Sequence, residues 1–169
     1  GALPPSWWID DLMRFHGVRY YVGLLSAAAL HGAAHHQPQE LQVVAGSVLR
    51  QLTAGRVRMR FFFRRHIGRA VTEQMKTPTG YIPVSTAEPT ALDLVRYRKG
   101  AGSIDHVATV IAELAERIGA RKLVAVARMV DELPVIQRLG YLLEWTGHSS
   151  LADGLANLLY VDRRGAPEN

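Results

Sequence analysis

The pattern of hydrophobic and polar positions is clearest at residues 56–63 (RVRMRFFF), where it repeats every two residues. One side of this repeat consists of Val57, Met59, Phe61 and Phe63, and the other consists of Arg56, Arg58, Arg60 and Phe62. A period of two is typical of a strand with one buried and one exposed face. The apolar run at residues 41–45 (LQVVA) predicts a further strand of the same sheet.

A β-hairpin is predicted from residues 71–76 (VTEQMK) and 81–86 (YIPVST). The connecting residues 77–80 (TPTG) have Pro at the second and Gly at the fourth position, as a type I turn prefers. With the two strands described above, the hairpin gives a sheet of about four strands. Because the strand pattern has one apolar face, we expect the sheet to be half-buried and largely antiparallel.

Helical periodicity replaces the strand pattern after the hairpin. Thr86 is the predicted N-cap of the next helix, since Pro89 then falls in the first turn, where no backbone donor is needed. Residues 104–118 carry apolar side chains at helical spacing, with Ser103 as N-cap and Gly119 as the stop. Further helices are predicted at 121–131, 133–146 and 150–159, and we expect the tail 162–169 to be frayed.

Two helices are predicted before the first strand. Ser6 can cap a helix over residues 7–16 (WWIDDLMRFH), and a second helix over residues 18–30 would end at Gly32. The order of elements predicts an α+β fold, with a small sheet flanked by N-terminal and C-terminal helices. We expect a single domain over residues 1–169, with a helical start (6–32), a sheet (41–86) and a helical part (87–159).

Composition restricts the possible functions. The chain is 48% hydrophobic and 21% charged, which is ordinary for a globular protein with one core. It contains no cysteine, which excludes disulfides, thiolate zinc sites and cysteine nucleophiles. No apolar run approaches the ~20 residues that span a bilayer, and no signal-peptide pattern is recognisable, so we expect a cytoplasmic protein.

Positive charge is concentrated between residues 50 and 69, which include seven arginines and no acidic residue, in a chain of net charge +5. Alternate side chains of a strand share a face, so this segment predicts a continuous positive surface. We call it the arginine strip; its residues are Arg56, Arg58, Arg60, Phe62, Arg64, Arg65 and Arg69. Phe62 would project with the arginines, where it could stack on a base or fill a partner's pocket.

Two classes of partner fit the arginine strip: the phosphates of a nucleic acid, and an acidic protein surface. A third interpretation is a solvated strand face whose charge is partly neutralised by Glu73 on a neighbouring strand. The excess of arginine over lysine suits bidentate contacts with phosphate or carboxylate, but a GC-rich genome would produce the same bias.

Catalytic and metal-binding patterns have simpler explanations. The spacing of His31 and His35, with His36 beside it, fits two ligands on one helix only if the helix continues beyond Gly32. The carboxylate of Glu73 near a lysine is reminiscent of metal-dependent nucleases, but such a site also needs a converging acid. The partners in that interpretation would be Lys76, Asp10 and Asp11. We expect no catalytic residues and no bound metal.

Two further features have structural interpretations. Asp93 lies among apolar helical neighbours, and we expect it to be partly buried and paired with an arginine such as Arg96 or Arg98. Trp7 and Trp8 are adjacent, so a helix cannot turn both to one narrow apolar face, and one could anchor a partner.

The segment KTPTGYIPVSTAEPTALDLVRY (76–97) carries a family resemblance. It follows YYVGLLSAAALHG (20–32) and LQVVAG (41–46), and it precedes GSIDHVATVIAELAERI (102–118). In this order the segments resemble the AbiEi antitoxins of type IV toxin–antitoxin systems, over roughly residues 18–145. One departure is Ala87, which stands where relatives tend to have Pro directly after Ser-Thr.

The resemblance implies a role in opposing a toxin. Members of the family typically join an N-terminal winged helix, which binds their own promoter, to a C-terminal domain that counteracts a nucleotidyltransferase-type toxin. No helix-turn-helix pattern precedes Tyr20, so we expect a C-terminal fragment or a shortened member, with DNA bound through the missing domain.

The implied antitoxin is not an enzyme and needs no cofactor. Its partner would be the cognate toxin, contacted directly or opposed functionally, or a shared nucleic acid such as transfer RNA. The alternative is a DNA-binding transcriptional regulator, for which the pI of about 9.9 and the basic strand are the usual features. That alternative lacks an identifiable helix for reading DNA bases.

Overall fold

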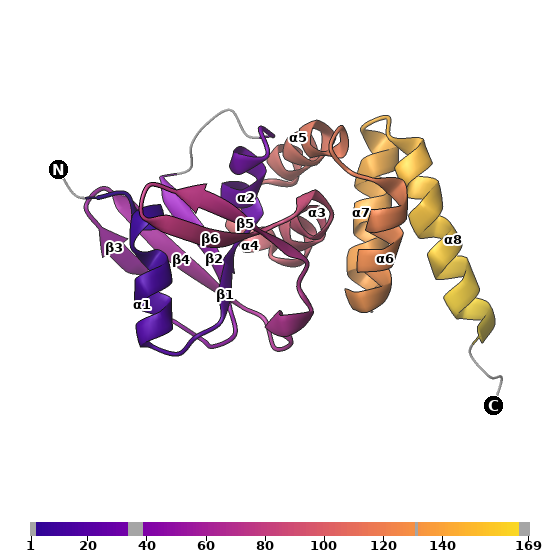
Figure 1. Cartoon of the computed structure of the whole chain (residues 1–169). Coiled ribbons are helices and arrows are strands. Elements are labelled where there is room, and N and C mark those ends of the chain that lie inside the picture. Colours follow the sequence, from indigo (N-terminus) through magenta and orange to yellow (C-terminus); the bar gives the residue numbers. More distant parts are fainter. Residues whose placement is uncertain (1–2, 34–38, 131, 166–169) are drawn as a thin grey trace. The chain divides into compact units, whose positions relative to one another are not determined.

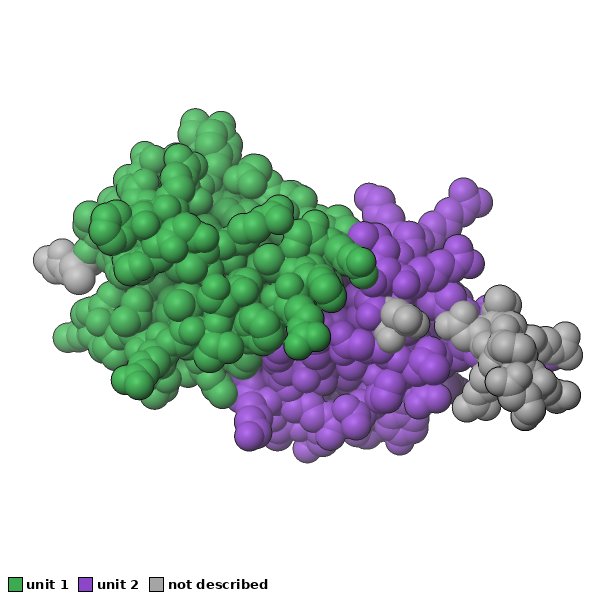
Figure 2. Space-filling model, turned by 90° about the horizontal axis from the view of Figure 1, so that it is seen from below, with its two compact units in different colours: residues 1–86 green, residues 87–169 purple. Residues whose placement is uncertain are grey.

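The computed structural model describes residues 3–33, 39–130 and 132–165. The chain separates into two compact units, residues 1–86 and 87–169, which Figure 2 shows in different colours. The boundary coincides with the predicted change from strand to helix patterns after Thr86. That the units form a single domain stays a prediction.

Unit 1 contains a six-stranded mixed sheet in the order β3-β4-β2-β1-β6-β5 (Figure 1). The strands are β1 (Tyr20–Val22), β2 (Glu40–Ala45), β3 (Leu52–Ala54), β4 (Val57–Phe63), β5 (Thr72–Thr77) and β6 (Gly80–Ser85). β2 and β4 are parallel, as are β1 and β6, whereas the other neighbours are antiparallel. The expectation of about four, largely antiparallel strands is therefore wrong in number and only partly right in direction. The predicted hairpin is confirmed, with Thr77 opposite Gly80.

The helix predicted over residues 18–30 is wrong in its first half. The structure has β1 there and a shorter helix, α2 (Leu24–Leu30), directly after Gly23. β1 lies between β2 and β6 in the interior of the sheet, and that position outweighs a local helical pattern. A Cβ atom on Gly23 would lie 3.1 Å from Val44 Cγ2, so Gly23 allows the chain to turn tightly against β2.

Two further predictions at this end of the chain need correction. β3 was not predicted, because a three-residue strand is too short to show an alternating pattern. Ser6 does not cap the first helix: residues Pro5–Trp7 form a 3₁₀ turn, and α1 (Ile9–Phe15) begins after Trp8 without a side-chain cap.

α1 covers one face of the sheet and completes the core of unit 1 (Figure 1). Its buried residues Ile9 and Met13 pack in one cluster with apolar residues from four strands. The strand residues of this cluster are Val22, Val43, Ala45, Met59, Ile82 and Val84. The register places these residues on one side of the sheet, and Arg58, Arg60 and Phe62 therefore project from the other side.

Unit 2 consists of helices throughout its described residues (Figure 1). They are α3 (Ala87–Arg96), α4 (Arg98–Ala101), α5 (Ile104–Ala115), α6 (Ala120–Val130), α7 (Leu133–Trp145) and α8 (Ser149–Gly165). α3 contacts α5, α6 and α7, and every residue from Ala87 to Val95 is buried. A helix that is buried on all sides forms the centre of a helical assembly.

Most predicted helices of this unit are confirmed within a few residues. Ser103 is the N-cap of α5, since its hydroxyl accepts a hydrogen bond from the backbone N–H of His106 at 3.3 Å. α5 ends at Ala115, before the predicted end at residue 118, and α8 extends to Gly165, into the segment expected to be frayed. Within the described part of the chain, no helix is long and apolar enough to cross a membrane.

Candidate functional site

β4 places the first half of the arginine strip along the sheet. Arg56 lies in the turn between β3 and β4, and the strand itself carries the next residues of the strip. The parallel register pairs Arg58 with Glu40, Arg60 with Gln42 and Phe62 with Val44. As predicted, the even-numbered residues of the strand share one face, so their positive charges lie side by side.

The carboxylate beside this part of the strip belongs to Glu40. Its Oε1 lies 3.9 Å from an amino nitrogen of Arg58, whose side chain is 55% exposed. Glu73, the expected neutralising residue, lies on β5 at the opposite edge of the sheet and contacts His31 at 3.9 Å. The sequence could not distinguish the two acids, because strand order is set by tertiary pairing. An exposed pair at this distance is weak, so Arg58 remains accessible to a partner.

Arg60 and Phe62 form a cation–π pair. The guanidinium carbon of Arg60 lies 5.0 Å from the centroid of the Phe62 ring. Phe62 is only 9% exposed, so its ring supports Arg60 from below and offers little surface for stacking on a base. That Phe62 stacks on a base or fills a partner's pocket stays a prediction.

The strip continues beyond the end of β4. Arg64 donates a hydrogen bond to the hydroxyl of Tyr21 at 3.1 Å, which holds its guanidinium group beside a residue of β1. Arg65 and Arg69 are exposed, and Arg69 closes a short 3₁₀ turn, Ile67–Arg69. The structure therefore places the arginines of the strip in the turn before β4, on β4 itself and in the loop that follows it.

Arg19 is a basic residue near the strip that the sequence interpretation missed. A Cβ atom built on Gly68 would lie 2.8 Å from an amino nitrogen of Arg19, so this guanidinium group lies against the 3₁₀ turn. The backbone N–H of Gly46 donates to the carbonyl of Arg19 at 2.9 Å, which holds the segment beside β2. Only the fold brings Arg19 to the 3₁₀ turn that contains Gly68, since about fifty residues separate the two in the sequence.

The described residues do not assemble the alternative sites proposed from sequence. His31 has its Nε2 2.7 Å from the carbonyl oxygen of Ser85, and His35 and His36 lie outside the described residues. Glu73 and Lys76 are three residues apart on β5, so they project from opposite faces. Among the residues that the structure describes, no three His, Asp or Glu side chains are grouped closely enough to bind one metal ion.

Asp93 has the buried ion pair expected for it. It is fully buried on α3 and pairs with Arg96 one turn later, and Arg96 also binds Glu132 at 3.0 Å. Burial lowers the pKa of Arg96, but the carboxylates of Asp93 and Glu132 outweigh this effect, so that the pKa is raised overall. This cluster is structural, because it fixes α3 against the start of α7.

The family comparison assigns most of the chain to one domain family. The AbiEi antitoxin C-terminal domain matches residues 21–145, which run from β1 to the end of α7. The chain belongs to this family. The arginine strip and both units therefore lie within, or overlap, the AbiEi domain.

Two solved structures share the fold of this AbiEi domain. The RV2827C protein from Mycobacterium tuberculosis is 14% identical, with a TM-score of 0.63 over 90% of this chain. The chain spans 57% of that protein. An antigenic nucleotidyltransferase-like protein from Paracoccidioides brasiliensis is 9% identical, with a TM-score of 0.52 over 89% of this chain and 90% of its own. No curated protein sequence matches the chain.

Proposed function

We propose that this chain is the antitoxin domain of a type IV toxin–antitoxin system and that it counteracts a nucleotidyltransferase-type toxin in the cytoplasm without catalysing a reaction. The observation that carries the proposal is the AbiEi match over residues 21–145. The function ascribed to the C-terminal domain of this family is opposition to the toxin, and that domain is the part that matches.

The arginine strip is the proposed means of action. Arg58 and Arg60 lie on one face of the sheet, where Arg58 makes a long ion pair with Glu40, and Arg56, Arg65 and Arg69 are exposed beside them. Phosphate groups arranged along a nucleic acid would complement such a linear set of guanidinium groups. The strip would then bind a nucleic acid that the toxin also uses, such as transfer RNA.

A shared substrate is proposed by fold-level analogy alone, since a fold by itself does not determine function. One of the similar structures is named as nucleotidyltransferase-like. A domain with a related architecture can present a nucleic-acid surface comparable to that of the toxin without the catalytic groups. Competition for the substrate would oppose the toxin without a stable complex between the two proteins.

Co-expression with the nucleotidyltransferase encoded beside the chain tests the proposal. We expect residues 1–169 to restore growth of cells that produce this toxin. A folded, expressed chain that leaves growth arrested would refute the antitoxin assignment. Growth is the appropriate readout because it reports toxin opposition whether the mechanism is direct or through a substrate.

A DNA-binding regulator is the second candidate, since the same strip and the pI of about 9.9 suit duplex DNA. It would regulate its own promoter as part of the full-length protein. This candidate predicts binding to the promoter at nanomolar concentrations that is sequence-specific at physiological salt. Binding that is equally tight to unrelated duplexes of the same length would reject it.

A further inference from the structure

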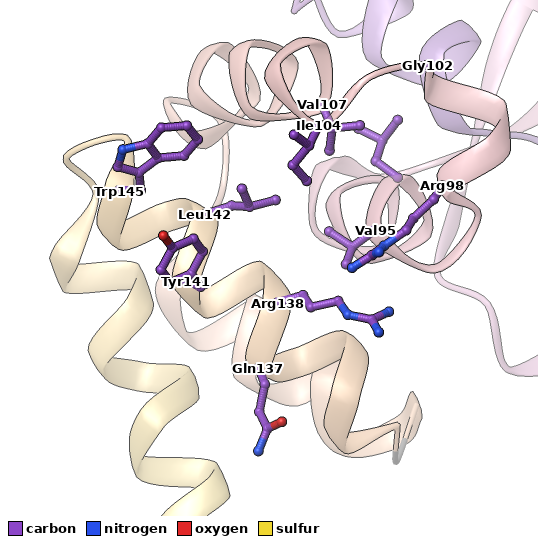
Figure 3. Close-up of a pocket in the computed structure, with 11 residues that line it drawn as sticks. Val95, Arg98, Gly102, Ile104, Val107, Gln137, Arg138, Tyr141, Leu142 and Trp145 are labelled. Atoms are coloured by element: carbon purple, nitrogen blue, oxygen red, sulfur yellow. The ribbon is translucent and has the colours of Figure 1, made fainter.

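Unit 2 contains an apolar groove that the proposed function does not use. The groove has a volume of about 490 Å³ and is bounded by α3, the α4–α5 connection, α5 and α7 (Figure 3). Its aliphatic lining comes from Leu94, Val95, Val107 and Leu142, which are buried. The size and the apolar lining are within the range of sites that hold a ligand or a partner's side chains.

The rim of the groove exposes large hydrophobic side chains. Ile104 is 53% exposed, Tyr141 is 67% exposed and Trp145 is 60% exposed. Tyr141 and Trp145 are one turn apart on α7, and their rings stack with centroids 6.4 Å apart and planes 27° apart (Figure 3). Contiguous exposed apolar surface of this kind, rich in aromatic residues, is characteristic of protein-binding sites.

The charge of the groove has one sign. Arg98 and Arg138 line it, as Figure 3 shows, and the lining includes no carboxylate among the residues that the structure describes. Gln137 adds an uncharged amide to the lining, and Tyr141 and Trp145 add a hydroxyl and an indole N–H. An occupant that combined apolar side chains with a carboxylate would complement both the floor and the two guanidinium groups.

We propose that this groove binds an amphipathic helix of a protein partner, with apolar side chains at helical spacing in the groove and a carboxylate facing Arg98 and Arg138. A groove between helices accepts a helix through anchors at i, i+3, i+4 and i+7. Tyr141 and Trp145 supply the rigid aromatic contacts that dominate such interfaces. The inference goes beyond the proposed function, because it concerns a different unit and needs no nucleic acid.

A nucleotide is a poorer match to the same surface. A base could stack on Trp145, and a phosphate could meet Arg138, as in single-strand binding proteins. The hydrogen-bonding edges of the base would then face Leu94, Val107 and Leu142, which offer no polar side-chain partner. Aliphatic side chains of a helix would bury the same surface without leaving buried polar groups unpaired.

Selection from a displayed library of random 16-residue peptides tests the proposal on the full chain. Peptides are first selected for binding to the parent protein. They are then sorted by whether they fail to bind the Y141A/W145A variant. The matched control F15A/Y160A removes two exposed aromatic residues outside the groove. We expect groove-dependent peptides that are helical when bound, carry apolar residues at i, i+3 or i+4, and have a net negative charge.

Affinity measurements with the best synthetic peptide complete the test. We expect binding to R98E/R138E to be at least ~10-fold weaker than to the parent, because opposite charges become like charges. R121E/R128E, with the same charge change on α6, should bind like the parent. Failure to recover groove-dependent peptides, or equal affinity for R98E/R138E, would overturn the proposal. Groove-dependent binding of oligo(dT) in place of peptides would also overturn it, in favour of a nucleic-acid site.

Discussion

Tyr20 connects β1 to α1 through a single hydrogen bond. Its hydroxyl donates to Oδ1 of Asp10 at 2.9 Å, and Asp10 also pairs with Arg14 at 2.9 Å. Burial, together with the hydrogen bond to the Asp10 carboxylate, raises the pKa of Tyr20 well above its ordinary value of 10.0. The folded protein therefore keeps this proton at pH values where the unfolded chain loses it.

The raised pKa of Tyr20 predicts a loss of stability at alkaline pH. Below pH 10 both states hold the proton, and the contribution of Tyr20 is fully present. Above pH 10 the unfolded chain binds fewer protons than the folded protein, so the free energy of unfolding falls as pH rises. We expect the stability advantage of the parent over Y20F, measured by urea unfolding, to shrink between pH 9 and pH 11.

The exposed Tyr81 provides the control for this comparison. Y81F removes the same hydroxyl from a side chain that is 58% exposed on β6. An advantage over Y20F that stays constant from pH 9 to pH 11 would contradict the account of Tyr20.

The positions and neighbours of individual site residues were partly predictable from the sequence. Alternation along residues 56–63 was enough to place the arginines on one face, because side-chain direction in a strand is a local property. The burial of Phe62, the role of Glu40 and the position of Arg19 were not predictable. Each depends on which strand or loop lies next to the strip, and no local pattern contains that information.

At the scale of elements, α5 shows how one residue sets a boundary. Ser103 accepts a hydrogen bond from the backbone N–H of His106, and Gly102 before it has a φ of 84°, which a residue with a side chain rarely adopts. Without the hydroxyl, the first turn of α5 would lose a hydrogen-bond acceptor for one of its backbone N–H groups, which have no partner within the helix. We expect S103A to lower the free energy of unfolding by about 1 kcal/mol.

Chemical denaturation of S103A measures this effect against S47A. Ser47 is exposed in the loop after β2, so its replacement changes the same atoms outside a helix cap. Equal stability of S103A and S47A would show that the cap contributes nothing.

Elements with a complete local signal were predictable, and the others were not. β4, the β5–β6 hairpin and α5 each have a periodic pattern together with turn or cap residues. β1 has only three residues and lies within a segment whose pattern suits a helix, so its identity depends on pairing with β2 and β6. Parallel pairing of β2 with β4 likewise depends on tertiary structure, since β3 and a turn separate them in the sequence.

At the scale of the whole molecule, the two units can be monitored separately by their tryptophans. Trp7 and Trp8 lie in unit 1, and Trp145 lies in unit 2. W145F keeps the tryptophans of unit 1, and W7F/W8F keeps the tryptophan of unit 2. If the chain is a single cooperative domain, the fluorescence midpoint of each variant should equal the midpoint of its own circular dichroism curve. Two separated midpoints would show that units 1 and 2 are independent domains.

Growth rescue by charge-reversed variants tests the central claim most directly. R56E/R58E/R60E reverses the arginine strip, whereas R117E/R121E/R128E has the same net charge and changes exposed residues of unit 2. R56E/R65E/R69E replaces exposed strip residues only, and it is used if the first variant unfolds. Circular dichroism and thermal melts verify that each variant is folded.

We predict that the parent and the unit 2 variant restore growth of cells producing the toxin, and that the folded strip variants do not. Rescue by the folded strip variants equal to that of the parent would contradict an antitoxin action through the arginine strip.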